Sequence, residues 1–242
     1  MTRICLMSDT HGYHRKVEVP NCDILIHCGD FTAHGREADA RDFNDWMGTL
    51  PCKHRISISG NHDWVMTRFK QDQFNHFDSV FSRARQAELT SNYTYLCDSG
   101  VTINGINFWG SPVTPQFCDW AFMIEGETNL AHHWKKIPNG TNVLITHGPA
   151  RGILDRNVRG EECGDEQLRE RVKHLDALYL HVCGHLHENF GGREVDTCRG
   201  EGTPDWWQNR YYATNVSILD EHYNLKNAPI VVDYEELVRT RY

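Results

Sequence analysis

The sequence predicts a layered α/β sandwich of mixed sheets. Short apolar runs of the β type recur along the chain, and each is followed by Gly, Asp, Asn or His. Near the middle, an alternating segment surrounds Asn104-Gly105, a pair typical of two-residue hairpin turns. Strands that alternate with helical stretches and also pair locally indicate sheets covered by helices.

The expected strands follow one another from the N-terminus. The runs that lead into polar motifs cover residues 4–8, 23–27, 55–59, 142–146 and 179–183. A hairpin is expected over residues 101–109, because apolar residues alternate on both sides of its turn. Two further strands are expected over residues 210–219 and 230–234. Together these segments predict a sandwich of mixed sheets.

One helix and one long loop complete the pattern. Over residues 36–50, which end before Pro51, apolar side chains recur at helical spacing: Ala40, Phe43, Trp46 and Met47. Residues 196–209 are rich in Gly and contain Pro, and are expected to form a loop. Its Trp206-Trp207 pair either caps a substrate site or, as the commoner role, pins the loop to the body.

Length and composition predict a single cytoplasmic domain. A chain of 242 residues with 39% apolar composition can build one substantial core, so a single domain is expected over residues 1–242. The first apolar stretch is too short for a signal peptide, and no run approaches the roughly 20 residues that span a bilayer. Nine cysteines without a Cys-x-x-Cys pair fit free thiols in a reducing cytosol. Cys5, Cys28 and Cys183 are expected to be buried.

The formal net charge of -8 bears on the partner. Proteins that grip long nucleic acids usually carry clustered Lys and Arg, which displace counterions. No such basic block occurs in this sequence. A small phosphorylated molecule is therefore the expected partner, and a nucleic acid duplex or a membrane is disfavoured.

Polar clusters stand directly after the expected strands. They are Asp9-Thr10-His11, Gly29-Asp30, Gly60-Asn61-His62-Asp63, Thr146-His147-Gly148 and Gly184-His185-Leu186-His187. The carboxyl ends of strands in one sandwich gather their loops at one edge, where open α/β sheets bind ligands. Asp, His and Asn offer oxygen and imidazole donors without thiolate, a set that suits Mn²⁺, Fe or Zn²⁺ better than Mg²⁺. The clusters predict a metal site.

The order of these clusters resembles the calcineurin-like metallophosphoesterase superfamily. Within it, four segments are similar to the metallophosphoesterase-domain-containing branch: Gly29-Asp30-Phe31-Thr32, Thr146-His147-Gly148-Pro149, Gly152-Ile153-Leu154-Asp155 and the end from Asn215 to Asp233. The similarity spans nearly the whole chain. The resemblance implies a four-layer α/β/β/α sandwich of two mixed sheets. It also implies two metal ions, with Mn preferred and Fe, Zn or Ni as alternatives.

The resemblance assigns a role to each matched residue. The implied ligands of the first metal are Asp9, His11, Asp30 and His187, and those of the second are Asp30, Asn61, His147 and His185. Asp30 would bridge the ions, which then share a water of lowered pKa and present hydroxide to the phosphoryl group. His62 resembles the general acid that protonates the leaving oxygen. Asn61 and His62 are also expected to contact substrate, as is His34, which follows Asp30 closely.

One departure from the family pattern narrows the substrate. Related protein phosphatases carry an Asp three places after the bridging Asp, followed by an Arg, whereas this chain has Ala33 and His34. Without the Arg, a phosphate monoester dianion lacks a bidentate clamp, so phosphodiesters are favoured. The Asp that orients the catalytic His is also missing, and Asp63 is a candidate for that role.

These observations predict a dinuclear-metal-dependent phosphodiesterase for small substrates such as cyclic nucleotides or simple diesters. Two alternatives stand beside it. One is a phosphomonoesterase or nuclease with the same metal site. The other is a nucleotide-binding or scaffold protein that retains the metals, although such a binder would have no need of His62.

Overall fold

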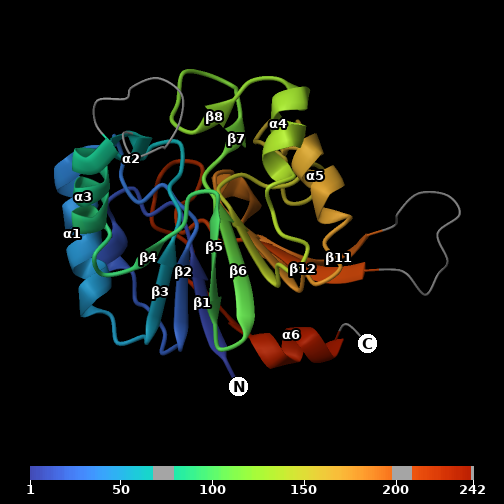
Figure 1. The fold of residues 1–242 in the computed structure, drawn as a ribbon, viewed down its shortest axis with the longest axis horizontal. Coiled ribbons are helices and arrows are strands. Elements are labelled where there is room, and N and C mark those ends of the chain that lie inside the picture. Colours follow the sequence, from blue (N-terminus) through green and yellow to red (C-terminus); the bar gives the residue numbers. More distant parts are fainter. Residues whose placement is uncertain (68–78, 198–208, 241–242) are drawn as a thin grey trace, which may run out of the picture.

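Two mixed β-sheets pack face to face in the computed structural model, which describes residues 1–67, 79–197 and 209–240 (Figure 1). The first sheet has the order β13-β1-β2-β3-β4. Its strands β1 to β4 run parallel, and β13 pairs antiparallel with β1. Its strands are β1 (Arg3–Met7), β2 (Ile24–His27), β3 (His54–Ser57), β4 (Thr94–Tyr95) and β13 (Ile230–Asp233).

The second sheet has the order β11-β12-β10-β9-β6-β5. Its four inner strands are parallel, while the edge strands β11 and β5 are antiparallel to their neighbours. Its strands are β5 (Ser99–Ile103), β6 (Ile106–Ser111), β9 (Val143–Thr146), β10 (Leu180–Cys183), β11 (Gly191–Thr197) and β12 (Asn209–Asn215). A separate short pair joins β7 (Thr114–Pro115) to β8 (Met123–Ile124).

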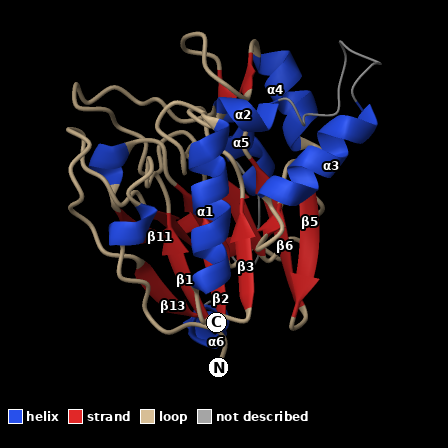
Figure 2. Ribbon diagram, turned by 90° about the vertical axis from the view of Figure 1, so that its left-hand side faces the viewer, coloured by secondary structure: helices blue, strands red, loops and turns tan. Residues whose placement is uncertain are grey.

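Helices cover the outer faces of both sheets. Figure 2 shows α1 crossing the first sheet, and Figure 1 places α4 and α5 beside the second. The α-helices are α1 (Glu37–Thr49), α2 (Trp64–Thr67), α3 (Ser79–Leu89), α4 (Glu127–Trp134), α5 (Glu166–Val172) and α6 (Tyr234–Thr240), and the 3₁₀ helices are η1 (His14–Lys16) and η2 (His187–Asn189). None of the helices in these ranges combines the length and the apolar character that crossing a bilayer requires.

Side-chain alternation along the strands generates the layers. In β1, Ile4 and Leu6 point between the sheets, where they join residues of the second sheet such as Ile145. Their neighbours Cys5 and Met7 point the other way, into the cluster formed with α1. Each fully buried Ile or Leu contributes roughly 1.5–3 kcal/mol relative to exposure. Both faces of this strand are therefore apolar, and it lies inside the sandwich.

A third cluster closes the other side. Leu144 of β9 points away from the first sheet and packs with Trp134 of α4 and Leu168 of α5. Helix α5 begins at the side chain of Asp165, which accepts hydrogen bonds from the backbone N–H groups of residues 167 and 168. The predicted four-layer α/β/β/α sandwich of two mixed sheets is confirmed.

Most predicted elements agree with the structure to within two residues, and the hairpin is confirmed in detail. Ile103 pairs with Ile106 across the turn. The turn residues Asn104 and Gly105 have φ of 52° and 80°, as two-residue turns that match strand twist require. Cys5, Cys28 and Cys183 are buried free thiols, as expected.

Two predicted segments are wrong in part. The strand expected over residues 210–219 ends at Asn215, whose side-chain amide donates to the carbonyls of Gly184 and Leu186 and turns the chain toward the centre described below. The loop expected over residues 196–209 is shorter, because Thr197 and Asn209 pair at the ends of β11 and β12. Residues 198–208, with the tryptophan pair, lie outside the described residues.

Candidate metal centre

The carboxyl ends of strands from both sheets meet at one edge of the sandwich. Within the first sheet, the N–H groups of Asp9 and His11 donate to the carbonyls of Gly29 and Asp30 at 3.0 Å each. Between the sheets, the backbone N–H of His185 donates to the carboxylate of Asp9 at 3.0 Å. Side chains that are far apart in the sequence thereby converge.

The backbone is strained where these side chains begin. Asp9, His11, Asp30 and His185 have φ of 54°, 41°, 55° and 70°, in the left-handed region that non-glycine residues rarely adopt. Each such residue costs on the order of 1 kcal/mol or more, and such strain gathers at functional sites. In this fold, the left-handed residues turn their side chains toward one point beyond the strand ends.

Two glycines allow the carboxylates to approach the backbone. A Cβ on Gly60 would clash with the Oδ1 of Asp30 and lie 2.5 Å from the Cε1 of His147. A Cβ on Gly184 would clash with the Oδ2 of Asp9. Any larger residue at either position would push a carboxylate out of the centre.

The converging donors form three overlapping groups. Within each group the candidate ligand atoms lie within 4.8 Å of one another, and the groups are Asp9, His11 and His187; His11, Asp30 and His62; and Asp30, His147 and His185. The Oδ2 of Asp30 lies 3.8 Å from the Nε2 of His11 and 3.3 Å from the Nε2 of His147. Asp30 therefore stands between two sets, as expected of a bridging carboxylate.

We call Asp9, His11 and His187 the first half-site, and Asn61, His147 and His185 the second. The Oδ1 of Asn61 lies 2.9 Å from the Nε2 of His147, which also faces Asp30. In the first half-site, the Nε2 of His187 lies 3.7 Å from the Oδ1 of Asp9. Every predicted ligand thus lies in one of the two half-sites or between them.

Backbone carbonyls orient three histidines of the centre. The Nδ1 atoms of His147, His187 and His62 lie 2.9, 3.0 and 2.8 Å from the carbonyl oxygens of Cys28, Asp220 and Ala33. Because a carbonyl can only accept, each Nδ1 carries a proton. Each Nε2 is then turned away from the carbonyl and toward the centre, the arrangement that outer partners impose on metal-binding histidines.

The arrangement fits divalent cations on two counts. Both ring nitrogens of buried His11 lack a hydrogen-bond partner within the described ranges, and such orphaned atoms are costly unless a ligand satisfies them. In the second half-site, the Oδ1 of Asn61 and the Oδ2 of Asp30 both face the Nε2 of His147. Oxygen and imidazole donors that converge in this way suit a divalent cation.

The charges of the side chains are strongly coupled. Burial alone would lower the pKa of His147, but nearby Asp30 outweighs it and raises this pKa to about 9. For His187, burial is outweighed by the hydrogen bond and charge of Asp9, which raise its pKa to about 9. Burial prevails at His11, whose pKa falls to about 4, and at His185, whose pKa falls to about 3. The protein without metal therefore holds protons at His147 and His187 that a cation would displace.

The expectation that Asp63 orients His62 is wrong, and the substrate contact expected of His34 stays a prediction. Asp63 does not orient that ring; its carboxylate accepts from the N–H groups of Asp30, Gly60 and Thr32 and from the Thr32 hydroxyl. It ties two ligand-bearing loops together instead. His34 is exposed, and among the described residues it makes no recorded hydrogen bond or ring contact with the centre.

Aromatic side chains that the motifs do not contain border the centre. Trp120 stacks on His62 with ring centroids 4.4 Å apart, and Phe117 contacts His185 at 5.4 Å. The ring of Tyr223 lies 5.0 Å from those of both His11 and His187. The sequence carries no periodic signal for them, because they come from loops whose paths depend on the whole fold.

Known proteins agree with this geometry. The family described as calcineurin-like phosphoesterase matches residues 2–189. Metallophosphoesterase domain-containing protein 1 of Homo sapiens is 35% identical, over 96% of this chain and 71% of that protein. A UPF0046 protein of Caenorhabditis elegans is 30% identical over 96% of this chain and 80% of its own length.

The chain belongs to the calcineurin-like phosphoesterase family. It is accordingly a metal-binding hydrolase of phosphate esters. A solved crystal structure that covers 88% of the chain and 90% of its own has a TM-score of 0.57 at 13% identity. That likeness supports the shared fold alone.

The part of the chain beyond the matched calcineurin-like region also contributes to the centre. A turn over residues 220–224 is closed by Asp220, whose carboxylate accepts from the N–H groups of His222 and Asn224. The carbonyl of Asp220 orients His187, and Tyr223, with φ of 61°, projects from the same turn toward the first half-site. This turn borders the first half-site and lies beyond the residues that match the family model.

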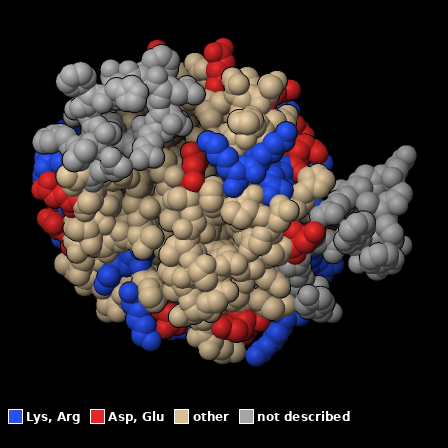
Figure 3. All heavy atoms as spheres, in the orientation of Figure 1, with Lys and Arg blue, Asp and Glu red and all other residues tan. Residues whose placement is uncertain are grey.

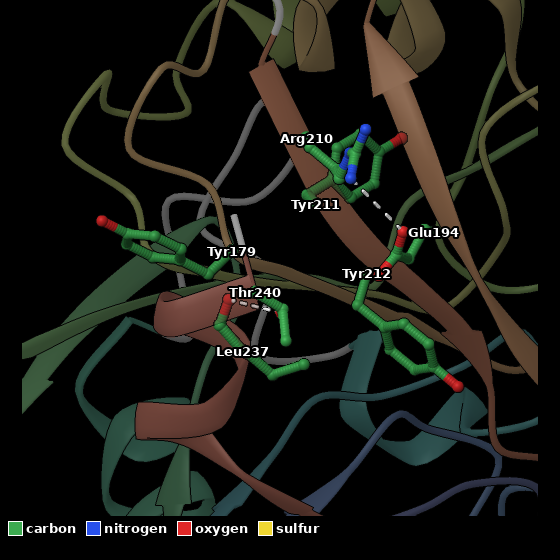
Figure 4. A pocket seen from close by; sticks show the side chains of 7 residues that line it. All are labelled: Tyr179, Glu194, Arg210, Tyr211, Tyr212, Leu237 and Thr240. Atoms are coloured by element: carbon green, nitrogen blue, oxygen red, sulfur yellow. Dashed lines mark hydrogen bonds and ion pairs between the residues drawn. The ribbon is translucent and has the colours of Figure 1, made fainter. Parts of the chain in front are cut away.

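A small hollow lies at the opposite end of the sandwich (Figure 4). It measures about 30 Å³, and among its lining residues are Tyr212 and Leu237. Tyr212 pairs with Leu180, the first residue of β10, whereas the centre follows the last residue of that strand. The hollow is therefore separate from the metal centre.

Proposed function

We propose that this chain is a dinuclear-metal-dependent phosphodiesterase that acts on small substrates such as cyclic nucleotides or simple diesters. The observation that carries the proposal is the position of Asp30 within ion-pair distance of His11 on one side and His147 on the other. A single carboxylate shared by two half-sites is what a pair of cations requires. Mn²⁺ is the first choice for these donors, and Fe, Zn²⁺ and Ni²⁺ are alternatives.

When bound, the cations supply a hydroxide nucleophile at neutral pH and offset the charge that builds on the phosphoryl oxygens. The protein's own residues do the rest. Asp9, Asp30, Asn61 and the histidines of the two half-sites would hold the cations. The backbone N–H of His62 donates to the Oδ1 of Asp30 at 2.7 Å, which couples the position of the His62 ring to the shared carboxylate.

His62 is suited to donate a proton to the leaving oxygen. Its Nδ1 is engaged by the carbonyl of Ala33, so that its Nε2 is the nitrogen available to substrate. The ring lies against His11, with centroids 4.6 Å apart. An imidazole so placed can act as a general acid.

The charged groups nearby favour a diester. Ala33 and His34 stand where related phosphatases carry Asp and Arg, and the family match leaves that choice open. Arg151 and Arg156 are each paired with Glu162, and Arg36 is paired with Asp39. None of these three described arginines is unpaired, as a residue that clamps a monoester dianion in a bidentate way would need to be.

The distribution of charge supports a small substrate. On the face shown in Figure 3, Lys and Arg form separate groups among Asp and Glu rather than a continuous basic stripe. Together with the net charge of -8, this pattern disfavours long nucleic acids. We place the protein in the reducing cytoplasm, on the strength of its odd number of cysteines without a Cys-x-x-Cys pair.

The test is to strip the purified protein of metal and assay an activated diester, the matching monoester, a cyclic nucleotide and an oligonucleotide after return of Mn²⁺, Ni²⁺, Zn²⁺ or Mg²⁺. Metal-dependent diester turnover that falls sharply in His62→Ala would support the proposal. Preference for the monoester or the oligonucleotide would replace the diester assignment. Two bound ions per chain without turnover of any substrate would make a binding protein the better interpretation.

A further inference from the structure

Besides its edge contact with His11, the His62 ring makes one hydrogen bond and one stacking contact, and neither of these two is to a carboxylate. Its Nδ1 donates to the carbonyl of Ala33 at 2.8 Å, and its ring stacks on Trp120 with centroids 4.4 Å apart and planes inclined by 27°. A single hydrogen bond fixes one point of an imidazole and leaves the ring able to swing about it. A parallel aromatic surface restricts that swing, because the rings lose contact when the imidazole tilts.

The backbone that follows Trp120 is held by hydrogen bonds. The N–H of Ala121, its neighbour, donates to the carbonyl of Asn61 at 3.2 Å, so the backbone beside Trp120 is bonded to the backbone beside His62. On the other side, the carbonyl of Phe122 accepts from the N–H of Thr114 at 3.2 Å. Ala121 and Phe122 are 1% and 4% exposed. A buried, hydrogen-bonded segment thus presents the half-buried indole to the imidazole.

We propose that Trp120 is a positioning residue that holds the Nε2 of His62 in line with the leaving oxygen. The inference rests on the proposed function, since it assumes that His62 is the proton donor. It adds a residue that acts through His62 in place of the missing Asp. Trp120 lies in a loop between β7 and β8, so this loop would govern how well the enzyme expels a poor leaving group.

A positioning role of Trp120 predicts a dependence on the leaving group that a merely structural role would not. Expulsion of p-nitrophenolate needs little protonation, whereas expulsion of unsubstituted phenolate depends on an acid in the right place. General acid catalysis contributes roughly 10²- to 10⁴-fold, so partial misplacement of the acid should cost about tenfold for the poorer leaving group. Loss of the stack should therefore steepen the dependence of rate on leaving-group basicity.

The experiment uses methyl aryl phosphates, which share one methyl ester and differ in the leaving phenol, with the Mn²⁺-loaded protein. For Trp120→Ala, we expect kcat/KM to fall about tenfold for methyl phenyl phosphate and by no more than about twofold for methyl p-nitrophenyl phosphate. Trp120→Phe, which keeps an aromatic plane, should retain most of the wild-type kcat/KM for methyl phenyl phosphate. Phe117→Ala, in the same loop but against His185, should leave the slope of the series unchanged.

A double-mutant cycle identifies the route of the effect. In a His62→Ala background, Trp120→Ala should cause no further steepening, because the residue through which it acts is gone. Crystal structures of the wild type and of Trp120→Ala should show the imidazole turned from its place and its bond to Ala33 lengthened. An imidazole that stays in place in the variant would contradict the inference.

The kinetic experiments distinguish a failure of the positioning role of Trp120 from a failure of the proposed function. Equal losses for all leaving groups in Trp120→Ala, with metal content and wild-type activity intact, would overturn the positioning role and leave the phosphodiesterase standing. Additive effects of the two substitutions would overturn it as well, and would indicate direct contact of Trp120 with substrate. Absence of diester turnover in the wild type would overturn both.

Discussion

The two half-sites of the metal centre differ in the hydrogen bonding of the histidines that face Asp30, His147 in the second and His11 in the first. In the second, His147 has partners at both ring nitrogens, the carbonyl of Cys28 at Nδ1 and Asn61 with Asp30 at Nε2. In the first, His11 is buried with no hydrogen-bond partner at either nitrogen among the described residues. His147 of the second half-site is thus stabilised within the folded chain, whereas His11 of the first depends on an ion for that compensation.

This difference suggests an order of events in metal binding. His147 and Asn61 of the second half-site are held in place by hydrogen bonds before any cation arrives, so little ordering cost remains for these two residues. At the first half-site, a cation would satisfy atoms that are otherwise orphaned. The shared Asp30 belongs to both and should be the residue whose loss is felt most widely.

The largest effect is expected for Asp30→Asn, which weakens both half-sites at once. We expect kcat/KM to fall by roughly 10³-fold or more, because the charge that would hold the two proposed cations together is lost. Steady-state kinetics and metal analysis by mass spectrometry measure the outcome. An Asp30→Asn protein that retains two ions and most of its activity would remove the basis for a shared carboxylate.

The next largest effect is expected in the unfolding free energy, when His147→Ala is compared with His11→Ala in the metal-free protein. Removing His147 leaves buried Asp30 without its closest cation, which should cost about 3 kcal/mol of unfolding free energy. Removing His11 deletes two unsatisfied nitrogens and should cost less than about 1 kcal/mol. Urea denaturation in the presence of a chelator measures both, and equal losses would erase the distinction between the half-sites.

A third effect concerns pH. The pKa of His147 and of His187 is raised to about 9; the folded state therefore binds more protons than the unfolded state above about pH 6.5, and stability falls as pH rises toward 9. Burial lowers the pKa of His11 to about 4 and that of His185 to about 3, so stability rises with pH up to about 6.5. We expect the metal-free protein to be most stable near pH 6.5.

The titration of Asp63 opposes this pH optimum, and loading with Mn²⁺ provides a control. Burial and the charge of Asp30 raise the pKa of Asp63 to about 7, which works against the rise in stability at acidic pH but is outweighed by the two histidines. Each histidine with a raised pKa should contribute on the order of 1–3 kcal/mol between pH 6.5 and 9. Thermal melts across pH test this, and the decline above pH 6.5 should disappear when saturating Mn²⁺ keeps the histidines neutral.

The smallest effect compares the threonines beside the two half-sites. The Thr10 hydroxyl lies 3.1 Å from the Nε2 of buried His27, and the Thr146 hydroxyl lies 2.8 Å from the Nε2 of buried His181. Thr146 also donates to the carbonyl of Gly148. Thr146→Val should therefore cost about 2 kcal/mol and Thr10→Val about 1 kcal/mol. Denaturation midpoints of the two variants give the comparison, and the reverse ranking would contradict it.

Much of the fold could be predicted from local patterns. The residues between strands β2 and β3 carry a clean helical period that ends before Pro51, and α1 covers nearly the expected range. An Asn-Gly pair such as Asn104-Gly105 favours the type of two-residue turn whose twist matches that of the flanking strands, so the hairpin was predictable. Patterns were weaker at β11 and β12, because Gly and charged residues in an edge pair resemble a loop until the partner strand is known.

The candidate site also combines features that the sequence predicts with features that it does not. Its ligands were predictable because short polar motifs follow apolar runs, and Asp9, Asp30, Asn61 and the histidines do converge. The partner of His62 was not, since the sequence offers Asp63 but the structure uses the carbonyl of Ala33 and the face of Trp120. Backbone carbonyls carry no sequence signature, and aromatic stacking across loops depends on where those loops pass.

By itself, the sequence determined the sandwich, the donor types and the order of the motifs, because periodicity and side-chain chemistry are local properties. Only the tertiary structure decided that His11 and His147, on either side of Asp30, differ in their hydrogen bonds, that Asp63 ties the ligand loops together, and that the turn carrying Tyr223 borders the first half-site. These features arise from distances between segments that are remote in the chain, and packing of the two sheets sets those distances.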